Sequence, residues 1–175
     1  MGKPAWVRRL LGQAIVIETD CQSLIVTAVE AHGGKALKFS NRFFTGVADL
    51  LIQLPGHSAC ILEAKLITLS KKTIETGHTW DVGCTVPQQR FLREWGEAGM
   101  KTGVVSFIQE HGVGLKTLRM AVYRYDVLST GGHSQPTTGG PLLPWVIQSY
   151  QHDLLGGKSE RNDNIIAQLE YFVGD

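Results

Sequence analysis

The chain has 175 residues, of which 43% are hydrophobic and 19% are charged, and its formal net charge is +1. This length suits one domain with a single core, and the composition is that of an ordinary globular protein. No apolar run approaches the roughly 18–20 residues that a membrane-spanning helix needs, and the N-terminus lacks the features of a signal peptide. We therefore expect no membrane partner and a cytoplasmic, intracellular protein.

The first predicted element is a helix from Thr19 to about His32, where apolar residues recur at the spacing of one helix face. The run from Thr19 to Gln22 fits a capping box, and the glycines at 33 and 34 end the helix. If Thr19 starts the helix, Glu18 lies just outside it. If the helix begins earlier, Glu18 points inward and is the functional candidate. Gln22, one turn later, is the substitute candidate for Glu18.

Three strands are predicted next, at Ala36–Phe39, Asp49–Leu54 and Ala59–Lys65. The last two form a hairpin around the turn-forming residues 55–58. Side chains alternate between the two faces of a strand, so one hairpin face is entirely apolar and must be buried. That face consists of Leu50, Ile52, Leu54, Cys60, Leu62 and Ala64.

The opposite hairpin face carries three charged residues, Asp49, Glu63 and Lys65, at the end far from the turn. With a three-residue loop at positions 55–57, residues whose numbers sum to 112 face each other, so that Asp49 lies directly across from Glu63. A four-residue loop shifts the pairing by one residue and leaves the same charged groups at the same end of the sheet.

The second half of the chain continues the pattern. A helix from Pro87 to about Ala98 carries Gln88, Phe91, Leu92 and Trp95 on one face, with Gly99 after it. Further elements are predicted as strands at Thr102–Ile108 and Leu118–Tyr125 and as helices at Pro141–Leu155 and Asn164–Phe172. The order α-β-β-β-α-β predicts an α/β (α+β) protein with a mixed sheet flanked by helices.

A stretch rich in glycine, serine and threonine at residues 129–141 predicts a flexible linker between a main domain, 1–128, and a C-terminal helical extension, 142–175. The extension contains four aromatic residues, Trp145, Tyr150, Tyr171 and Phe172. Two roles for it remain open: it helps to form a dimer, or it packs onto its own domain.

The three cysteines, Cys21, Cys60 and Cys84, are widely spaced and form no CxxC pair, so neither a zinc ribbon nor a disulfide framework is indicated. Cys21 and Cys60 fall on apolar faces, where we expect them to be core thiols.

Basic residues are concentrated in the first part of the chain. Residues 1–72 contain nine Lys and Arg against five Asp and Glu, and this excess favours a polyanionic partner such as nucleic acid. Ordinary solvated surface is the alternative reading for the candidate phosphate contacts, which are Arg8, Arg9, Lys35, Lys38, Arg42, Lys71 and Lys72.

Two carboxylates and a lysine on adjacent strands need a physical explanation, because gathering like charges is costly without compensation. A divalent cation such as Mg²⁺ is a natural compensation, since Asp and Glu oxygens are hard ligands. A metal there polarises a phosphodiester, and Lys65 stabilises the developing charge. A surface salt-bridge cluster on a solvated sheet face is the alternative, and spacing alone does not decide between them.

The run Gly46-Val47-Ala48-Asp49, followed by Ile61-Leu62-Glu63-Ala64-Lys65, resembles the GxPD…(V/I)ExK signature of PD-(D/E)xK nucleases. It is more narrowly similar to the stand-alone VRR-Nuc and phage Holliday-junction-resolvase-like branch. Further matching features, in the same order across residues 18–108, are Glu18, Gly33-Gly34, Lys38-Phe39, Gln88 with Gly99, and residues 102–106. The chain departs from the pattern by having Ala48 in place of proline and a longer connection at residues 66–87.

The resemblance implies a restriction-endonuclease-like αβββαβ core with a C-terminal helical extension. It implies that Asp49, Glu63, the backbone carbonyl of Ala64 and Glu18 ligate Mg²⁺ or Mn²⁺, that Lys65 is catalytic, and that Glu18 and Gln88 complete the site. The expected activity is a metal-dependent endonuclease acting on DNA, with branched DNA as the favoured substrate.

The resemblance also implies a homodimer, because two symmetric nicks across a junction require two-fold symmetry. A phage origin, with action in the host cytoplasm, is expected from the family resemblance alone. Two alternatives stay open: a catalytically silent nucleic-acid-binding module with the same fold, and a nuclease acting on linear or damaged DNA or on RNA.

Overall fold

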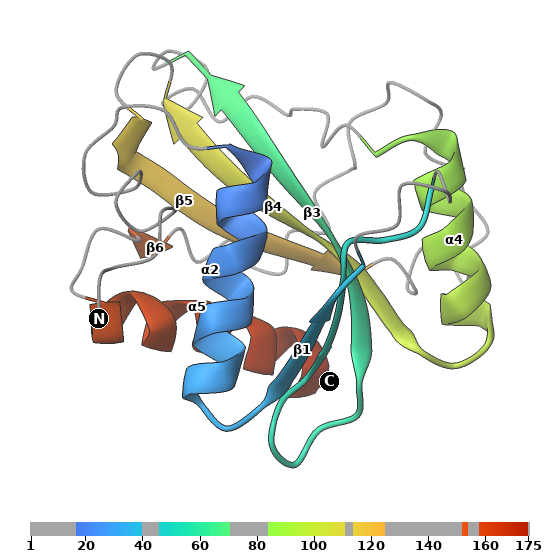
Figure 1. Cartoon of the computed structure of the whole chain (residues 1–175). Coiled ribbons are helices and arrows are strands. Elements are labelled where there is room, and N and C mark those ends of the chain that lie inside the picture. The colour runs from blue at the N-terminus through green and yellow to red at the C-terminus, as the bar shows by residue number, and fades with distance from the viewer. Residues whose placement is uncertain are drawn as a thin grey trace.

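The computed structural model describes residues 17–39, 46–70, 84–110, 114–124, 152–153 and 158–174. These residues form a six-stranded mixed sheet flanked by helices (Figure 1). The elements are α2 (Glu18–Ala31), β1 (Lys35–Lys38), β2 (Leu50–Gln53), β3 (Cys60–Leu69), α4 (Val86–Glu97), β4 (Lys101–Glu110), β5 (Gly114–Arg124), β6 (His152–Asp153) and α5 (Lys158–Gly174). The predicted α/β class and the core order αβββαβ are confirmed, together with a C-terminal helix.

The strands lie in the order β1-β2-β3-β4-β5-β6, and every neighbouring pair is antiparallel except β3 and β4. A parallel pair cannot be joined by a tight turn and needs a crossover connection, which usually contains a helix. Here the crossover between β3 and β4 contains α4. The start of α4 is thereby brought to the sheet close to the middle of β3.

The hairpin has the predicted register. Leu50 pairs with Leu62 and Ile52 pairs with Cys60, so the numbers of facing residues sum to 112. Gly56, in the loop, has a φ of 78°, which is in the left-handed region that favours glycine. The strand β3 continues to Leu69, so the first part of the connection predicted at residues 66–87 is strand.

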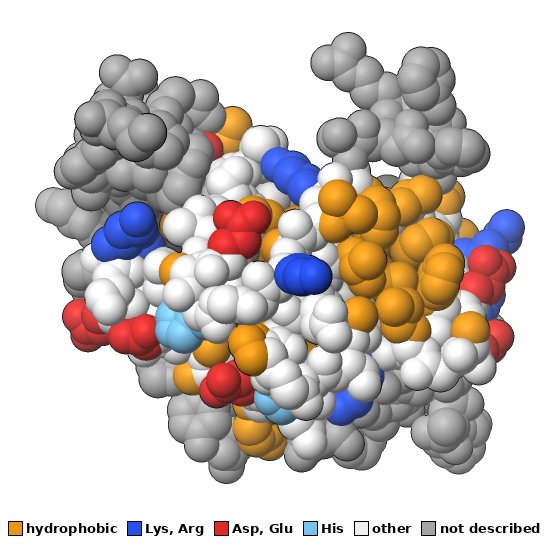
Figure 2. All heavy atoms as spheres, turned by 60° about the horizontal axis from the view of Figure 1, so that its bottom comes forward, with side chains coloured by type: hydrophobic (Ala, Val, Ile, Leu, Met, Phe, Trp, Pro, Cys, Tyr) orange, Lys and Arg blue, Asp and Glu red, His pale blue; other side chains and the backbone are white. Residues whose placement is uncertain are grey.

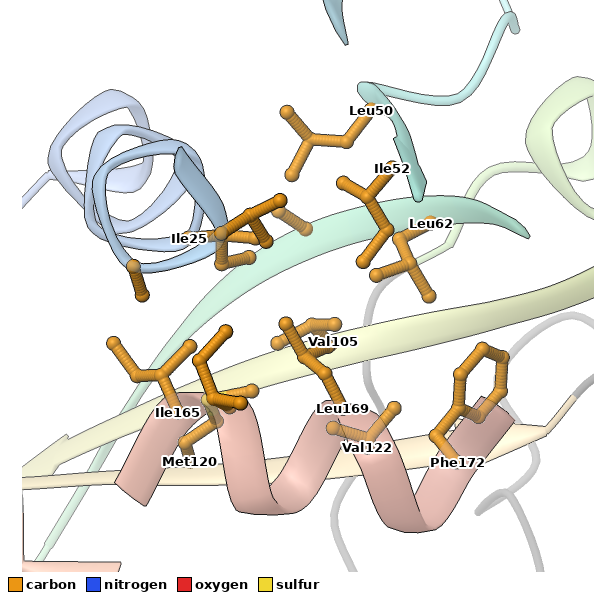
Figure 3. Close-up of a cluster of buried hydrophobic side chains, with 14 of the residues drawn as sticks. Ile25, Leu50, Ile52, Leu62, Val105, Met120, Val122, Ile165, Leu169 and Phe172 are labelled. Atoms are coloured by element: carbon orange, nitrogen blue, oxygen red, sulfur yellow. The ribbon is translucent and has the colours of Figure 1, made fainter. Parts of the chain in front are cut away.

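The larger core lies between the sheet and the two helices α2 and α5 (Figure 3). It contains all six residues of the predicted apolar hairpin face, each at most 1% exposed. Val105 and Phe107 of β4 and Met120 and Val122 of β5 extend this face across the sheet. Cys21 and Cys60 are buried here as predicted, and burial raises the pKa of the Cys60 thiol to about 12.

The opposite face of the sheet is covered by α4. Leu92 is fully buried and packs with Ile61 of β3 and Val104 of β4. Trp95 lies on the same helix side as Phe91, as the spacing predicted, and their rings contact each other at an angle, but Trp95 is 44% exposed and Phe91 is half-buried. Leu92 is the one buried residue of α4 and its main contact with the sheet. On the surface, hydrophobic side chains gather on the side of the molecule that carries α4 (Figure 2).

The start of α2 differs from the prediction. The helix begins at Glu18, and the N–H of the preceding Ile17 donates to the carboxylate of Asp20 at 3.2 Å. Asp20 therefore closes the first turn, and the capping box predicted from Thr19 to Gln22 is wrong. Glu18 lies inside the first turn, where the partial positive charge of the helix N-terminus favours an acidic side chain.

Both α2 and α4 end at the predicted glycines. Gly33 has a φ of 77° and Gly99 a φ of 92°. The N–H of each following residue, Gly34 or Met100, donates back to a carbonyl of the last helical turn at 2.9 Å or 3.0 Å. This arrangement satisfies carbonyl groups that a helix end otherwise leaves unpaired.

The C-terminal helix is part of the main core rather than a separate unit. α5 buries Ile165, Leu169 and Phe172 in the cluster that also contains α2 and the sheet. Of the two roles left open for the extension, α5 therefore takes that of packing onto its own domain. No helix in the described part of the chain has the length and apolar character needed to cross a membrane.

The helix predicted at Pro141–Leu155 is wrong at His152–Asp153, which form β6 and pair with Arg119 and Met120 of β5. Long-range pairing with the sheet overrides the local pattern there. The rest of that predicted helix, and the linker predicted at 129–141, lie outside the described residues.

Leu62→Ala tests the assignment of the hairpin core. Leu62 is fully buried between the sheet and its covering helices, so we expect the substitution to lower the free energy of unfolding by roughly 2–5 kcal/mol. Urea unfolding measures this change, with Leu37→Ala on the exposed side of β1 as the control. A loss of under about 1 kcal/mol contradicts the assignment, because that is the size expected of a surface change.

Candidate active site

The predicted carboxylates meet at the open end of the hairpin. Asp49 directly precedes β2, and its Oδ2 accepts a hydrogen bond from the backbone N–H of Ala64 at 2.9 Å. Its backbone carbonyl accepts from the N–H of Phe39 at 2.8 Å, which joins the end of β1 to the start of β2. The carboxylate is therefore held against β3, beside Glu63, the residue that precedes Ala64 in that strand.

Glu63 is a fully buried carboxylate. Its Oε1 accepts a hydrogen bond from Lys65 Nζ at 2.6 Å and another from Gln88 Nε2 at 2.5 Å. Its Oε2 is also buried and has no hydrogen-bond partner among the described residues. One oxygen of this group thus receives two donors while the other is left for a further partner.

Gln88 reaches Glu63 because of how α4 begins. Thr85 is the N-cap, and its hydroxyl accepts from the N–H of Gln88 at 3.4 Å. In return, Gln88 Oε1 accepts from the N–H of Thr85 at 2.9 Å and from its hydroxyl at 3.1 Å. This capping box fixes the Gln88 side chain with its oxygen toward the cap, so that its NH₂ group faces Glu63. One side chain both closes the helix and binds the buried carboxylate.

Gly46 allows this helix start to approach the hairpin. Its φ is 95°, and a Cβ atom built on it falls 2.3 Å from the Cβ of Pro87. Any other residue requires both strain and displacement at this point. The glycine of the GxxD motif therefore lets the segment that carries Asp49 touch the first turn of α4, one residue from Gln88.

Burial dominates the electrostatics of the pair Glu63 and Lys65. Burial, together with the negative charge of Asp49, raises the pKa of Glu63 to about 7 against the opposing effect of Lys65. Burial by itself lowers the pKa of Lys65, but its hydrogen bond to Glu63 and the charges of Glu63 and Glu18 outweigh it and leave that pKa above its ordinary value. At neutral pH, Glu63 is poised between its charged and neutral forms.

Glu18 lies half-buried in the first turn of α2, close enough for its charge to act on Lys65. Gln22, the alternative candidate one turn later, is buried at 7% exposure. In the described part of the chain no three His, Cys, Asp or Glu side chains are arranged to hold a metal ion, so Glu18 is not gathered with Asp49 and Glu63 into one three-carboxylate group.

The remaining oxygen groups still suit Mg²⁺, which binds through one or two carboxylates, retains several waters and accepts substrate phosphate oxygens. The N–H and C=O of one strand residue point to the same neighbouring strand. Because the Ala64 N–H is bound to Asp49, the Ala64 carbonyl lies on the same side of β3 as Asp49. Asp49, the unpaired oxygen of Glu63 and this carbonyl form a donor set of the kind that Mg²⁺ prefers.

The predicted phosphate contacts are not brought to this point. Lys38 is opposite Leu50, which belongs to the α2 side of the sheet, and Lys35 is opposite Gln53 at the far end of the hairpin. The other candidates, Arg8, Arg9, Arg42, Lys71 and Lys72, lie outside the described residues.

The chain was compared with protein-family models, with curated proteins and with solved structures. None of them matches it.

Three residues near the site carried no functional prediction. Thr85 orients Gln88, and a threonine three residues before a glutamine at a helix start is a readable capping signal. Cys84 is a free cysteine close enough to Lys65 to affect its pKa. Ser106 pairs with Lys65 across the parallel strands β3 and β4. No local sequence pattern predicts that pairing.

Glu63→Gln tests the buried carboxylate through the pH dependence of stability. Between the ordinary pKa of 4.5 and the folded value of about 7, the native protein holds a proton that the unfolded chain has lost. Wild-type stability therefore falls as pH rises through this window, by roughly 3 kcal/mol. Glutamine does not titrate, so the variant does not show this loss.

Urea unfolding between pH 4 and pH 8 measures the effect. We expect the free energy of unfolding of Glu63→Gln to increase relative to that of the wild type as pH rises. Glu30→Gln, at an exposed position of α2, is the control and should follow the wild type. Parallel profiles for all three proteins contradict the raised pKa.

Proposed function

We propose that this chain is a metal-dependent nuclease of the PD-(D/E)xK class that hydrolyses DNA phosphodiester bonds. The observation that carries the proposal is the buried Glu63, which has Lys65 and Gln88 on one oxygen, no partner on the other, and Asp49 beside it. A solvated salt-bridge cluster does not explain a fully buried carboxylate with an unpaired oxygen, because such a group is costly to bury.

The proposed roles follow from these contacts. Asp49, Glu63 and the Ala64 carbonyl hold the Mg²⁺, and Mn²⁺ is expected to substitute for it. When bound, the ion supplies charge stabilisation at the phosphate and a more acidic water. Gln88 keeps the Glu63 carboxylate in one orientation, so that its second oxygen stays available.

Lys65 has a separate role. Its ammonium group is the one cation placed on Glu63 in the described part of the chain, and it lies on the same strand face two residues away. Hydrogen-bond donors held in a low-dielectric site stabilise charge that develops in a transition state. We assign to Lys65 the stabilisation of the negative charge that builds up on the phosphate oxygens. Glu18 contributes through its charge, which acts on Lys65.

Branched DNA is the proposed substrate, from the resemblance to the VRR-Nuc and phage resolvase-like branch. Action in the cytoplasm and a phage origin belong to the same proposal and rest on that resemblance alone. The alternatives remain a nuclease for linear DNA or RNA, whose metal chemistry is the same, and a silent binding module. The joint presence of Asp49, Glu63 and Lys65 favours an enzyme over the silent module, because an inactive descendant is free to lose any of them.

A nicking assay tests the proposal. Wild type and Lys65→Ala are incubated with a four-way DNA junction, linear duplex, single-stranded DNA and RNA, with Mg²⁺, Mn²⁺ or EDTA. We expect cleavage that requires the metal and falls at least about 100-fold in Lys65→Ala, because the group that stabilises the transition state is lost. Lys158→Ala, at the exposed start of α5, is the lysine control and keeps its activity.

The substrate that is cut fastest identifies the substrate class. If the protein binds the junction but cleaves no substrate, the result favours the silent binding module over the nuclease. Cleavage that persists in EDTA contradicts the metal-dependent mechanism.

The homodimer proposal needs a surface other than the buried face of α5. Phe172 is 1% exposed within its own domain, whereas Tyr171 is 48% exposed and remains available. We expect light scattering to report twice the mass of one chain at micromolar concentration, and Tyr171→Asp to lower the dimer fraction. A strict monomer at every concentration removes the support for two symmetric nicks by one enzyme.

A further inference from the structure

Ser106 lies beside Lys65 on the neighbouring strand. The parallel register of β3 and β4 pairs these two residues directly. Val104 belongs to the cluster on the α4 side, whereas Val105 and Phe107 belong to the cluster on the α2 and α5 side. Because side chains alternate along a strand, Ser106 faces the same side as Val104, and this is also the side of Glu63 and Lys65.

The Ser106 hydroxyl is fully buried and has no hydrogen-bond partner among the described residues. A folded protein rarely leaves a buried hydroxyl unpaired, because its lost hydration is not replaced. Such an atom gains stability from any donor that can reach it. The partner has to come from the same face, since the other face of β4 is filled by apolar side chains.

Lys65 is the side chain positioned to donate a hydrogen bond to Ser106. An ammonium group has three N–H donors, and the contact with Glu63 Oε1 occupies one direction. Neighbouring strands lie about 4.8 Å apart, so the stem of Lys65 runs next to Ser106 while its head rests on Glu63. The Lys65 side chain is 14% exposed, so the protein does not enclose it completely.

We propose that Ser106 is a positioning residue for Lys65. Its hydroxyl accepts a hydrogen bond from the ammonium group when Lys65 leaves Glu63 and turns toward the phosphate. Lys65 thus has two positions on one sheet face, one on the Glu63 carboxylate and one on Ser106. This inference rests on the proposed function for its catalytic meaning, but the two positions of Lys65 can be detected without any cleavage.

Thr102 is the matched control for this inference. It is on the same strand and the same face, is fully buried, and also has a hydroxyl without a partner among the described residues. It pairs with Ile61, four residues away from Lys65 along β3. A general effect of removing a buried hydroxyl appears in both positions, whereas an effect that acts through Lys65 appears only at Ser106.

The test is the rate at which an amine-reactive reagent labels Lys65 in EDTA, measured by peptide mass spectrometry against Lys35 of the same molecule. Without Ser106 the ammonium group stays on Glu63, where its reactivity is low. We expect Ser106→Ala to slow the labelling by about three-fold, the factor that corresponds to one modest hydrogen bond. Thr102→Val should leave the rate unchanged.

Cleavage kinetics add a second readout. Ser106→Ala should lower kcat by about ten-fold, as is common when the partner of a catalytic group is removed, with KM unchanged and the urea midpoint not lowered. If Ser106→Ala does not fold, Ser106→Cys, which keeps the size but accepts hydrogen bonds weakly, replaces it.

Equal labelling rates in wild type, Ser106→Ala and Thr102→Val overturn the inference, and so does an equal change in both variants. If the wild type cleaves no substrate while Ser106→Ala alone slows the labelling, the proposed function fails and the placement of Lys65 by Ser106 stands.

Discussion

The structure of the site depends on the burial of the Glu63 carboxylate. A carboxylate taken fully out of water has to be compensated by charge and hydrogen bonds, or it becomes protonated. Here Lys65 and Gln88 provide that compensation on one oxygen, while burial and then the negative charge of Asp49 raise the pKa of Glu63 to about 7. A cation on the free oxygen would complete the compensation, and the proposed function assigns Mg²⁺ to this place.

The contacts that surround Glu63 are also contacts that hold the fold together. The crossover between the parallel strands β3 and β4 brings in α4, and the capping box at its start turns Gln88 toward the carboxylate. The close approach of Gly46 to Pro87 brings the hairpin segment against the same helix turn. Stability and chemistry are therefore coupled at this point, since a shift of α4 changes the environment of Glu63.

The sequence alone determined the features that depend on local spacing. Alternation along the hairpin separated its apolar face from the face with Asp49, Glu63 and Lys65, and the short turn around Gly56 fixed the pairing. Glycine ended α2 and α4 where it was expected, because only glycine adopts the required conformation at little cost. These features involve residues that are close along the chain, and the chemistry of each residue is enough to specify them.

Only the tertiary structure decided what depends on distant segments. His152–Asp153 pair with β5 as a strand although the local pattern predicts a helix, and on α4 the packing buries Leu92 while Trp95 stays 44% exposed. Gln88 was expected at the site from family resemblance, but its contact with Glu63 requires the crossover to place α4 on the sheet. Ser106 adjoins Lys65 through a parallel pairing of strands some forty residues apart. Periodicity shows which face of an element a residue occupies, and only the packing of elements determines what that face meets.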